Sequence, residues 1–84
     1  PDAPIHYVRA RGCRVVATDG VEYVDLVSAL GAVALGYADP EVTAAVSRAA
    51  ADGNVAGLTS VLEPALAERL CDVIPCAERA LFLK

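Results

Sequence analysis

The sequence lacks the features that mark several common classes of protein. No apolar run approaches the roughly 20 residues that a membrane-spanning helix needs, and the 7 basic residues are scattered along a chain of net charge −4. The amino terminus reads Pro-Asp-Ala-Pro and not a basic segment followed by an apolar run. These absences argue against a membrane protein, a secretory signal and a nucleic-acid-binding surface. We therefore expect a cytoplasmic protein without membrane or nucleic-acid partners.

Cysteines and glycines also lack the spacing of a metal or nucleotide site. The three cysteines, at positions 13, 71 and 76, are odd in number and form no Cys-x-x-Cys pair. This pattern favours reduced thiols over a disulfide framework or a metal site. Gly31 and Gly36 precede no Lys-Ser or Lys-Thr, and no Gly-x-Gly-x-x-Gly occurs. We therefore expect no metal site, no phosphate loop and no dinucleotide site.

Apolar residues, by contrast, are in excess. Of the 84 residues, 56% are hydrophobic, whereas about 45–50% is usual. A domain this small buries only roughly 60% of its unfolded surface. The chain also begins at Pro1, without methionine. We therefore expect the chain to be one piece of a larger fold or to pack against a partner, and we expect it to associate when isolated.

The first 26 residues predict a three-stranded antiparallel meander over 5–10, 13–18 and 21–26. Asp19-Gly20 stands between two apolar, β-branched runs, which is typical of a two-residue type I′ turn with positive φ at both central residues. Alternation along the first strand predicts Ile5 and Tyr7 on one face. His6 lies on the opposite face, away from any second ligand or nucleophile, and we interpret it as structural. Strands this short need a packing partner.

Two amphipathic helices are expected after a short helical turn and loop at 27–37. Asp39 as cap, with proline and glutamate next, predicts a helix start, and Gly53 predicts its end. Ser60 and Glu63 fit a capping box at the start of the second helix, which Pro75 ends. The apolar stripes are Val42, Ala45, Val46 and Ala49 in the first helix and Leu62, Leu66, Leu70 and Val73 in the second. The apolar run 80–83 predicts a strand buried on both faces, so we expect further chain to follow.

The order and spacing of these motifs resemble the amino-terminal segment of the class III aminotransferases, pyridoxal phosphate enzymes that include the glutamate-1-semialdehyde aminomutases. The resemblance covers nearly the whole chain. It rests on Asp19-Gly20-x-Glu22-Tyr23-x-Asp25, on Gly31 to Gly36 followed by Asp39-Pro40-Glu41-Val42, on Leu66-Ala67-Glu68-Arg69-Leu70, and on Phe82-Leu83-Lys84.

The resemblance implies an α/β fold of the fold type I pyridoxal phosphate transferases, here reduced to an antiparallel β-meander, two helices and the first strand of the large domain. Residues 1–38 would form the meander and loop of a small domain. Residues 39–84 would lead into the large cofactor-binding domain, which is absent from this chain. It also implies a homodimer in the complete enzyme, pyridoxal 5′-phosphate as cofactor, and small-molecule amine and carbonyl substrates.

By this resemblance the chain itself carries no catalytic and no cofactor-binding residue. The Schiff-base lysine lies elsewhere, and the phosphate-binding turn would follow Lys84, so we expect the 84 residues alone to be inactive. The expected substrate-binding residues are Ser28, Ala29, Leu30 and Gly31. In the aminomutases a tryptophan often occupies the place of Leu30, and this departure weakens the case for a semialdehyde substrate.

Several alternatives remain open from the sequence. Leu30 is either a substrate contact or a core residue. The stretch 57–60 either reaches substrate or, through Ser60, merely caps a helix. Asp19, Glu22 and Asp25 resemble a carboxylate cluster, but roles in the turn and at the hairpin edge explain them better. For the protein as a whole, the rivals to an aminotransferase segment are an aminomutase, a free-standing protein-interaction module without catalysis, and a structural remnant of a split chain.

Overall fold

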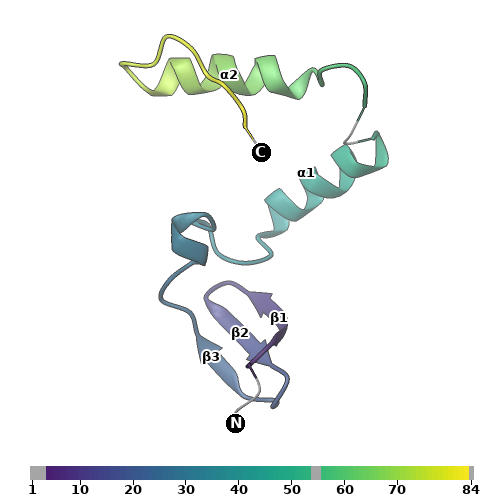
Figure 1. The fold of residues 1–84 in the computed structure, drawn as a ribbon, viewed down its shortest axis with the longest axis vertical. Coiled ribbons are helices and arrows are strands. Elements are labelled where there is room, and N and C mark those ends of the chain that lie inside the picture. The colour runs from purple at the N-terminus through teal and green to yellow at the C-terminus, as the bar shows by residue number, and fades with distance from the viewer. Residues whose placement is uncertain (1–3, 54–55, 84) are drawn as a thin grey trace. The chain divides into compact units, whose positions relative to one another are not determined.

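The structure, a computed structural model, describes residues 4–53 and 56–83 (Figure 1). The chain divides into two compact units, Pro1–Arg48 and Ala49–Lys84, and α1 crosses the boundary between them. In chain order the elements are β1 (Tyr7–Arg11), β2 (Arg14–Ala17), β3 (Glu22–Val24), the 3-10 helix η1 (Ala29–Gly31), α1 (Pro40–Ala51) and α2 (Leu62–Val73).

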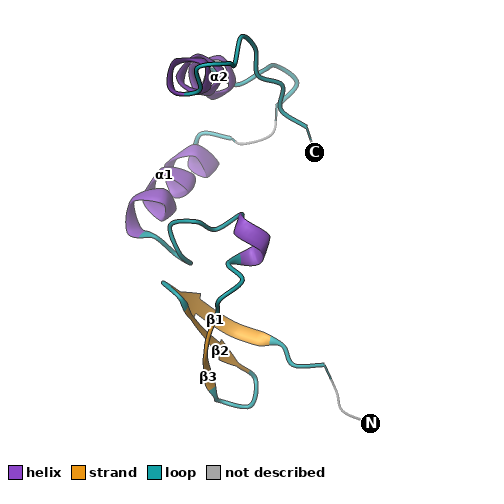
Figure 2. Cartoon of the chain, turned by 90° about the vertical axis from the view of Figure 1, so that its left-hand side faces the viewer, coloured by secondary structure: helices purple, strands orange, loops and turns teal. Residues whose placement is uncertain are grey.

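The three strands form one antiparallel sheet in the order β1-β2-β3, which confirms the predicted meander (Figure 2). Residues directly opposite one another in such a sheet share a face. Ala10 faces Val15, and Val15 faces Tyr23, so one face is apolar. On the other face Val16 stands between an arginine of β1 and Glu22 of β3. The meander therefore has one apolar and one charged face, as alternation predicts.

The alternation is interrupted once in β1, where the pairing register shifts between Tyr7 and Arg9. An extra residue in one strand of an antiparallel pair moves the following side chains to the opposite face. Tyr7 and Ala10 consequently lie on the same face although they are three residues apart. Ile5 and Tyr7 do share a face, as predicted, and line an apolar cavity of about 600 Å³. Ala17, opposite Tyr7, is 3% exposed and is the only fully buried hydrophobic residue among those described.

The second hairpin turn is not the predicted two-residue type I′ turn. Ala17 N–H donates to Val21 O at 3.0 Å, and Gly20 N–H donates to Ala17 O at 3.0 Å. This pairing encloses a three-residue loop, 18–20, whose last residue is Gly20 with φ of 81°. Asp19 does not have positive φ. A turn followed by a left-handed glycine is the usual form of a three-residue hairpin loop, so the prediction for Gly20 holds and that for Asp19 is wrong.

The start of α1 confirms the predicted cap. Asp39 Oδ1 accepts hydrogen bonds from Glu41 N–H at 3.1 Å and Val42 N–H at 3.0 Å. These contacts satisfy two of the four donors that a helix leaves free at its amino end. Pro40 occupies the first helical position, where its missing N–H costs nothing. Gly53, with φ of 93°, follows the last turn, as expected of a helix-ending glycine.

The start of α2 corrects the predicted capping box. Ser60 Oγ accepts a hydrogen bond from Leu62 N–H at 3.2 Å, but the Glu63 side chain makes no return bond to the Ser60 backbone among the described contacts. The helix begins at Leu62, two residues after the serine, so Glu63 stands too early in the helix to reach back. At the other end Ile74 is extended, with φ −109° and ψ 105°. The ring of Pro75 causes this, because it clashes with a preceding residue in helical geometry.

The predicted strand at 80–83 is not formed. No β-pairing is present at these positions, and Leu81 and Leu83 are 82% and 83% exposed. A strand exists only where a neighbouring strand accepts and donates its backbone hydrogen bonds. No strand of the described residues lies beside this run, so an apolar sequence alone does not produce the element. The expected strand needs further chain to pair with it and to cover it, and the described residues do not test its burial on both faces.

Apolar side chains remain largely uncovered in both units. A compact 8.7 kDa monomer exposes about 4,700 Å², and two separate units of half that mass about 5,700 Å². The chain exposes 7649 Å². The predicted stripes of α1 and α2 are part of this surface, because neither helix has a buried residue. Burying a stripe of this kind normally stabilises a helix in a protein, so the helices need further protein to cover them.

Neither α1 nor α2 is long and apolar enough to cross a membrane, within the residues that the structure describes.

Candidate functional site

The predicted substrate stretch lies in a loop, residues 25–37, whose two ends meet. Asp25 N–H donates to Cys13 O at 2.8 Å. Tyr37 and Gly12 exchange two backbone hydrogen bonds, both of 2.8 Å. The loop therefore starts and ends against the two adjacent residues of the turn between β1 and β2. Compact surface loops of 6–16 residues or so with joined ends are frequently functional.

The side chain of Asp25 binds three groups of this loop. Its Oδ1 accepts hydrogen bonds from Val27 N–H at 2.7 Å and Ser28 N–H at 3.2 Å. Its Oδ2 accepts the hydroxyl hydrogen of Tyr37. The Tyr37 hydroxyl, assisted by the Val27 N–H, holds the pKa of Asp25 below its usual value, and the carboxylate raises the pKa of Tyr37. Both pKa shifts favour the same protonation state, in which a charged Asp25 carboxylate accepts the hydrogen of a protonated Tyr37 phenol.

Four consecutive residues of the loop have left-handed backbone angles. Ser28, Ala29 and Leu30 have φ of 51°, 50° and 59°, and Gly31 has φ of 89°. A non-glycine residue in this region costs roughly 1–2 kcal/mol. Such strain concentrates at ligand-binding and active sites. All four expected substrate residues thus lie in the most strained turn of the described chain.

The turn also determines how Leu30 is presented. Its backbone is non-helical within η1, with φ 59° and ψ 33°, and the side chain is 93% exposed. Leu30 is therefore not buried by the described residues, and both alternatives, substrate contact and core residue of the complete protein, stay open. An apolar side chain held outward on a strained turn is poised to contact another molecule or another part of the protein.

Gly36 makes the closure of the loop possible, and Gly36→Ala tests this role. A Cβ at this position would stand 3.2 Å from Gly12 Cα and Gly12 O, and its φ is 91°. We expect Gly36→Ala to lower the free energy of unfolding by about 1–3 kcal/mol through clash and strain. Thermal unfolding of the full-length protein measures the loss.

Gly57→Ala is the matched control for this prediction. A Cβ at Gly57 meets no atom within 4 Å, and Gly57 does not have positive φ. The same added methyl group should therefore leave stability unchanged or slightly raised. Equal effects of the two substitutions would show that the approach of Gly36 to Gly12 is unimportant.

Asp19 and Tyr23, the earlier residues of the Asp-Gly-x-x-Tyr-x-Asp motif, hydrogen-bond at the hairpin loop between β2 and β3. Asp19 Oδ1 accepts Val21 N–H at 2.9 Å, and Asp19 Oδ2 accepts the Tyr23 hydroxyl at 3.1 Å. This bond, with the charge of Asp19, raises the pKa of Tyr23. Glu22 pairs with Arg14 at 2.6 Å. The three acids therefore support turns and strand edges, as expected, and do not form a paired-carboxylate site.

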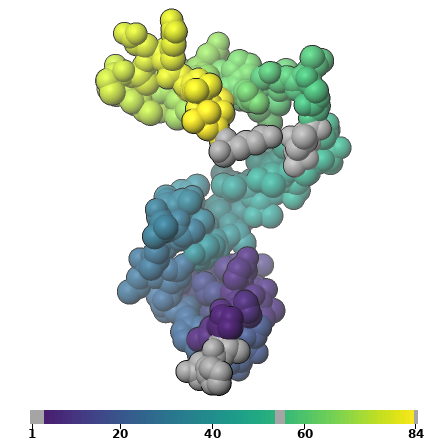
Figure 3. All heavy atoms as spheres, viewed as in Figure 1, coloured from purple at the N-terminus to yellow at the C-terminus, as the bar shows by residue number. Residues whose placement is uncertain are grey.

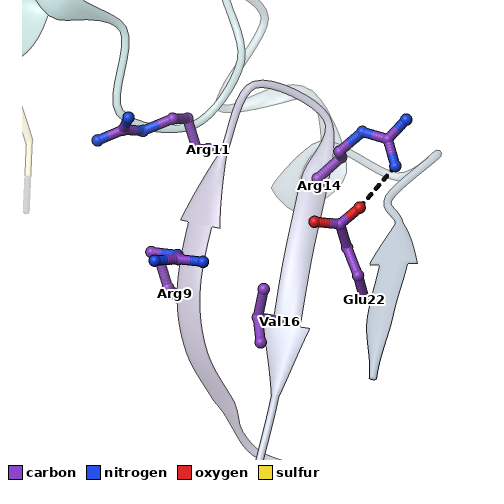
Figure 4. Close-up of a pocket in the computed structure, with 5 residues that line it drawn as sticks. All are labelled: Arg9, Arg11, Arg14, Val16 and Glu22. Atoms are coloured by element: carbon purple, nitrogen blue, oxygen red, sulfur yellow. Dashed lines mark hydrogen bonds and ion pairs between the residues drawn. The ribbon is translucent and has the colours of Figure 1, made fainter. Parts of the chain in front are cut away.

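Sequence reasoning missed a group of arginines on the charged face of the sheet. Arg9, Arg11 and Arg14 line a cavity of about 340 Å³ together with Val16 and Glu22 (Figure 4). Strand spacing predicts this gathering, because residues two apart on β1 share a face and Arg14 stands opposite Arg11. Only Arg14 has an ion-pair partner among the described residues, and the pair is half exposed, so it contributes little stability.

The other candidates from the sequence are not part of this loop. The stretch 57–60 belongs to the second unit, whose colour runs from teal through green to yellow in Figure 3. Ser60 there meets the amino end of α2, which supports its reading as a helix cap. His6 is exposed, and its backbone carbonyl accepts Thr18 N–H at 2.9 Å. The described residues include no cluster of three metal-ligating side chains.

The described residues do not fit pyridoxal phosphate. A phosphate group is bound well at a helix amino terminus with free N–H groups. The amino end of α1 is occupied by the Asp39 carboxylate, and the first turn of α2 carries Glu63, so both ends repel an anion. No lysine lies among the described residues, because the single lysine of the chain is Lys84. No step of cofactor chemistry is therefore assigned to these residues.

Comparison with known proteins places the chain in a family. The family model described as aminotransferase class-III matches residues 1–84. The chain belongs to the class III aminotransferases. As a class III aminotransferase segment it is 38% identical to a glutamate-1-semialdehyde 2,1-aminomutase of Symbiobacterium thermophilum, over 96% of this chain and 19% of that protein. It is 39% identical to a 2′-deamino-2′-hydroxyneamine transaminase of Streptomyces kanamyceticus, over 100% of this chain and 23% of that protein.

The backbone of this aminotransferase segment is similar to that of a solved transaminase. The crystal structure of an omega-transaminase from Sphaerobacter thermophilus matches with a TM-score of 0.85 at 37% identity, over 90% of this chain and 17% of that one. This likeness, with an antiparallel meander followed by two helices, confirms the predicted fold class of a fold type I segment. The chain spans about a fifth of the length of the relatives it matches.

Proposed function

We propose that this chain serves as the amino-terminal part of a pyridoxal phosphate-dependent aminotransferase, which transfers an amino group between a small-molecule amine and a carbonyl compound. The likeness of its backbone to the omega-transaminase carries the proposal. In the complete enzyme, residues 1–38 would belong to the small domain and residues 39–84 would lead into the large domain. The uncovered stripes of α1 and α2 support this placement, since a large domain and a second subunit would cover them.

Within that enzyme we assign the substrate-facing role to Ser28, Ala29, Leu30 and Gly31. Their left-handed backbone and the exposure of Leu30 support the assignment. The described residues contribute no group that holds the cofactor. Their part in the reaction is to shape one wall of the substrate site and to exclude water there, while the cofactor and its anchors lie outside them.

An aminomutase is the second candidate, and the relatives named as glutamate-1-semialdehyde aminomutases favour it. The two activities differ in where the amino group goes. A transaminase passes nitrogen from one molecule to a second carbon skeleton, whereas an aminomutase returns an isomer of its own substrate. Transamination is therefore seen as a mass change of the acceptor, whereas the isomer has the mass of its substrate and is separated from it by chromatography.

The test supplies the full-length, cofactor-loaded enzyme with a ¹⁵N-labelled amine donor and a carbonyl acceptor, and follows the label by mass spectrometry. We expect labelled nitrogen in the acceptor. Leu30→Ala should lower kcat/KM for a bulky apolar acceptor by about tenfold, because covering a leucine contributes about 1.5 kcal/mol or more. Leu30 is suited to this contact because its side chain is 93% exposed.

Leu35→Ala is the control for the Leu30 variant. Leu35 lies in the same loop and is 76% exposed, but outside the left-handed turn. It should leave kcat/KM nearly unchanged. Equal losses in the two variants would contradict the assignment of the turn. Release of an isomer without acceptor would favour the aminomutase, and the absence of both products would contradict the proposed function.

A further inference from the structure

The carboxylate of Asp25 controls the entry into the left-handed turn. Its Oδ1 accepts the N–H groups of Val27 and Ser28, the two residues through which the chain passes into the turn. The turn's own hydrogen bonds between residues 27 and 33, at 3.0–3.3 Å, are all longer than the 2.7 Å bond from Val27 N–H to Asp25. Since three successive non-glycine residues resist this conformation, the carboxylate is needed to hold the first of them in place.

Tyr37 in turn controls the orientation of that carboxylate. Its hydroxyl donates to Oδ2, the oxygen that the turn does not use. The tyrosine is itself held by the two backbone hydrogen bonds to Gly12. The Tyr37 side chain is therefore held at the end of the loop, 12 residues along the chain from Asp25, whose carboxylate it contacts. A hydrogen bond to a charged acceptor from a held donor fixes direction as well as distance.

We propose that Asp25 and Tyr37 are positioning residues for the substrate-facing turn 28–31. The Tyr37 hydroxyl orients the Asp25 carboxylate, and the carboxylate holds the turn in its left-handed form. This inference rests on the proposed function, because it takes the turn to be the surface that meets the carbonyl substrate. It adds that the fit of the substrate depends on a hydroxyl group that does not itself touch the substrate.

The chain offers a matched pair of variants for the test. Tyr37→Phe and Tyr23→Phe each remove one phenolic hydroxyl that donates to an aspartate of the same motif. The Tyr23 hydroxyl, however, donates to Asp19 of the hairpin loop, and no hydrogen bond joins it to residues 27–33 among the described contacts. In the full-length enzyme we expect Tyr37→Phe to speed hydrogen exchange of the amides at 27–33 by about tenfold. The KM for the carbonyl substrate should rise about fivefold with kcat nearly unchanged, as for a lost binding contact.

Tyr23→Phe should change neither the hydrogen-exchange rate of the amides at 27–33 nor the KM for the carbonyl substrate. Asp25→Asn is a second variant, since its amide oxygen still accepts from Val27 and Ser28, while the NH2 group that then faces Tyr37 cannot accept the hydroxyl hydrogen and can only donate to the hydroxyl oxygen. It should give smaller changes of the same kind as Tyr37→Phe, and it serves if that variant does not fold.

Three results would overturn the inference. In Tyr37→Phe, the amides at 27–33 could exchange hydrogen as slowly as in the wild type, or exchange could rise equally throughout the enzyme. Alternatively, exchange at 27–33 could rise while the KM for the carbonyl substrate stays unchanged. A wild-type enzyme that transfers no amino group is a separate failure, that of the proposed function. In that case the exchange of residues 27–33 still decides whether the pair holds the turn.

Discussion

Incubation of the isolated 84-residue chain with pyridoxal phosphate is expected to give no bound cofactor and no Schiff-base absorbance, and the chain is expected to be inactive. The cofactor needs a lysine for its Schiff base, a partner for its pyridine nitrogen and a cradle for its phosphate. The only lysine is Lys84. A carboxylate stands at the amino end of each helix, with Asp39 as the cap of α1 and Glu63 in the first turn of α2.

Absorbance and mass spectrometry after borohydride reduction measure this result, with the complete enzyme as the positive control. A stoichiometric, reducible adduct on one amine of the isolated chain would contradict the prediction. Lys84→Arg then identifies the site, because it leaves only the terminal amine as an alternative. A trace of adduct that is lost on dilution is ordinary aldehyde reactivity of any exposed amine and leaves the prediction standing.

Gly20→Val is expected to destabilise the complete enzyme by about 1–3 kcal/mol. Gly20 has φ of 81°, and a Cβ there meets no atom within 4 Å. The cost is therefore backbone strain and not a clash. β-Branched residues are strongly disfavoured at such angles. Relief of the strain would require the hairpin to change register, which turns Val15 and Tyr23 to the charged face.

Gly20→Asn is the control, since asparagine tolerates positive φ and has a side chain of similar size. It should be nearly neutral. The melting temperature, bound cofactor and turnover of the two variants are compared in the full-length enzyme. We expect Val to lower stability and turnover more than cofactor retention, because we expect the groups that hold the cofactor to lie outside the described residues. Equal behaviour of Val and Asn would contradict the left-handed assignment of Gly20.

The elements that could be predicted from the sequence are those determined by neighbours along the chain. Asp39 caps α1 through N–H groups two and three residues away, and Pro75 ends α2 through the residue before it. The hairpin follows from the alternation of β2 and β3 around Asp19-Gly20. In each case the interacting groups are close in sequence, so the pattern of residues contains the interaction.

The sequence alone did not predict interactions between residues that are distant along the chain, nor the exact geometry of some local turns and caps. These required the structure. Asp19 was predicted to be left-handed, but the loop has three residues because Ala17 pairs with Val21. The run 80–83 is apolar enough for a strand, yet a strand requires a neighbour to accept its hydrogen bonds. Ser60 and Glu63 have capping-box spacing, but the helix begins too late for the glutamate to reach back.

The candidate site shows the same division. Residues 28–31 were expected to bind substrate because of the resemblance to the family. Their composition alone does not indicate a substrate site. Only the tertiary structure brings Tyr37 to Asp25, because the loop between them must first close on Gly12 and Cys13. The sequence therefore determined which residues stand in the loop. The tertiary structure decided that the three non-glycine residues 28–30 adopt positive φ, because that strain is tolerated only where bonds from outside the turn hold it.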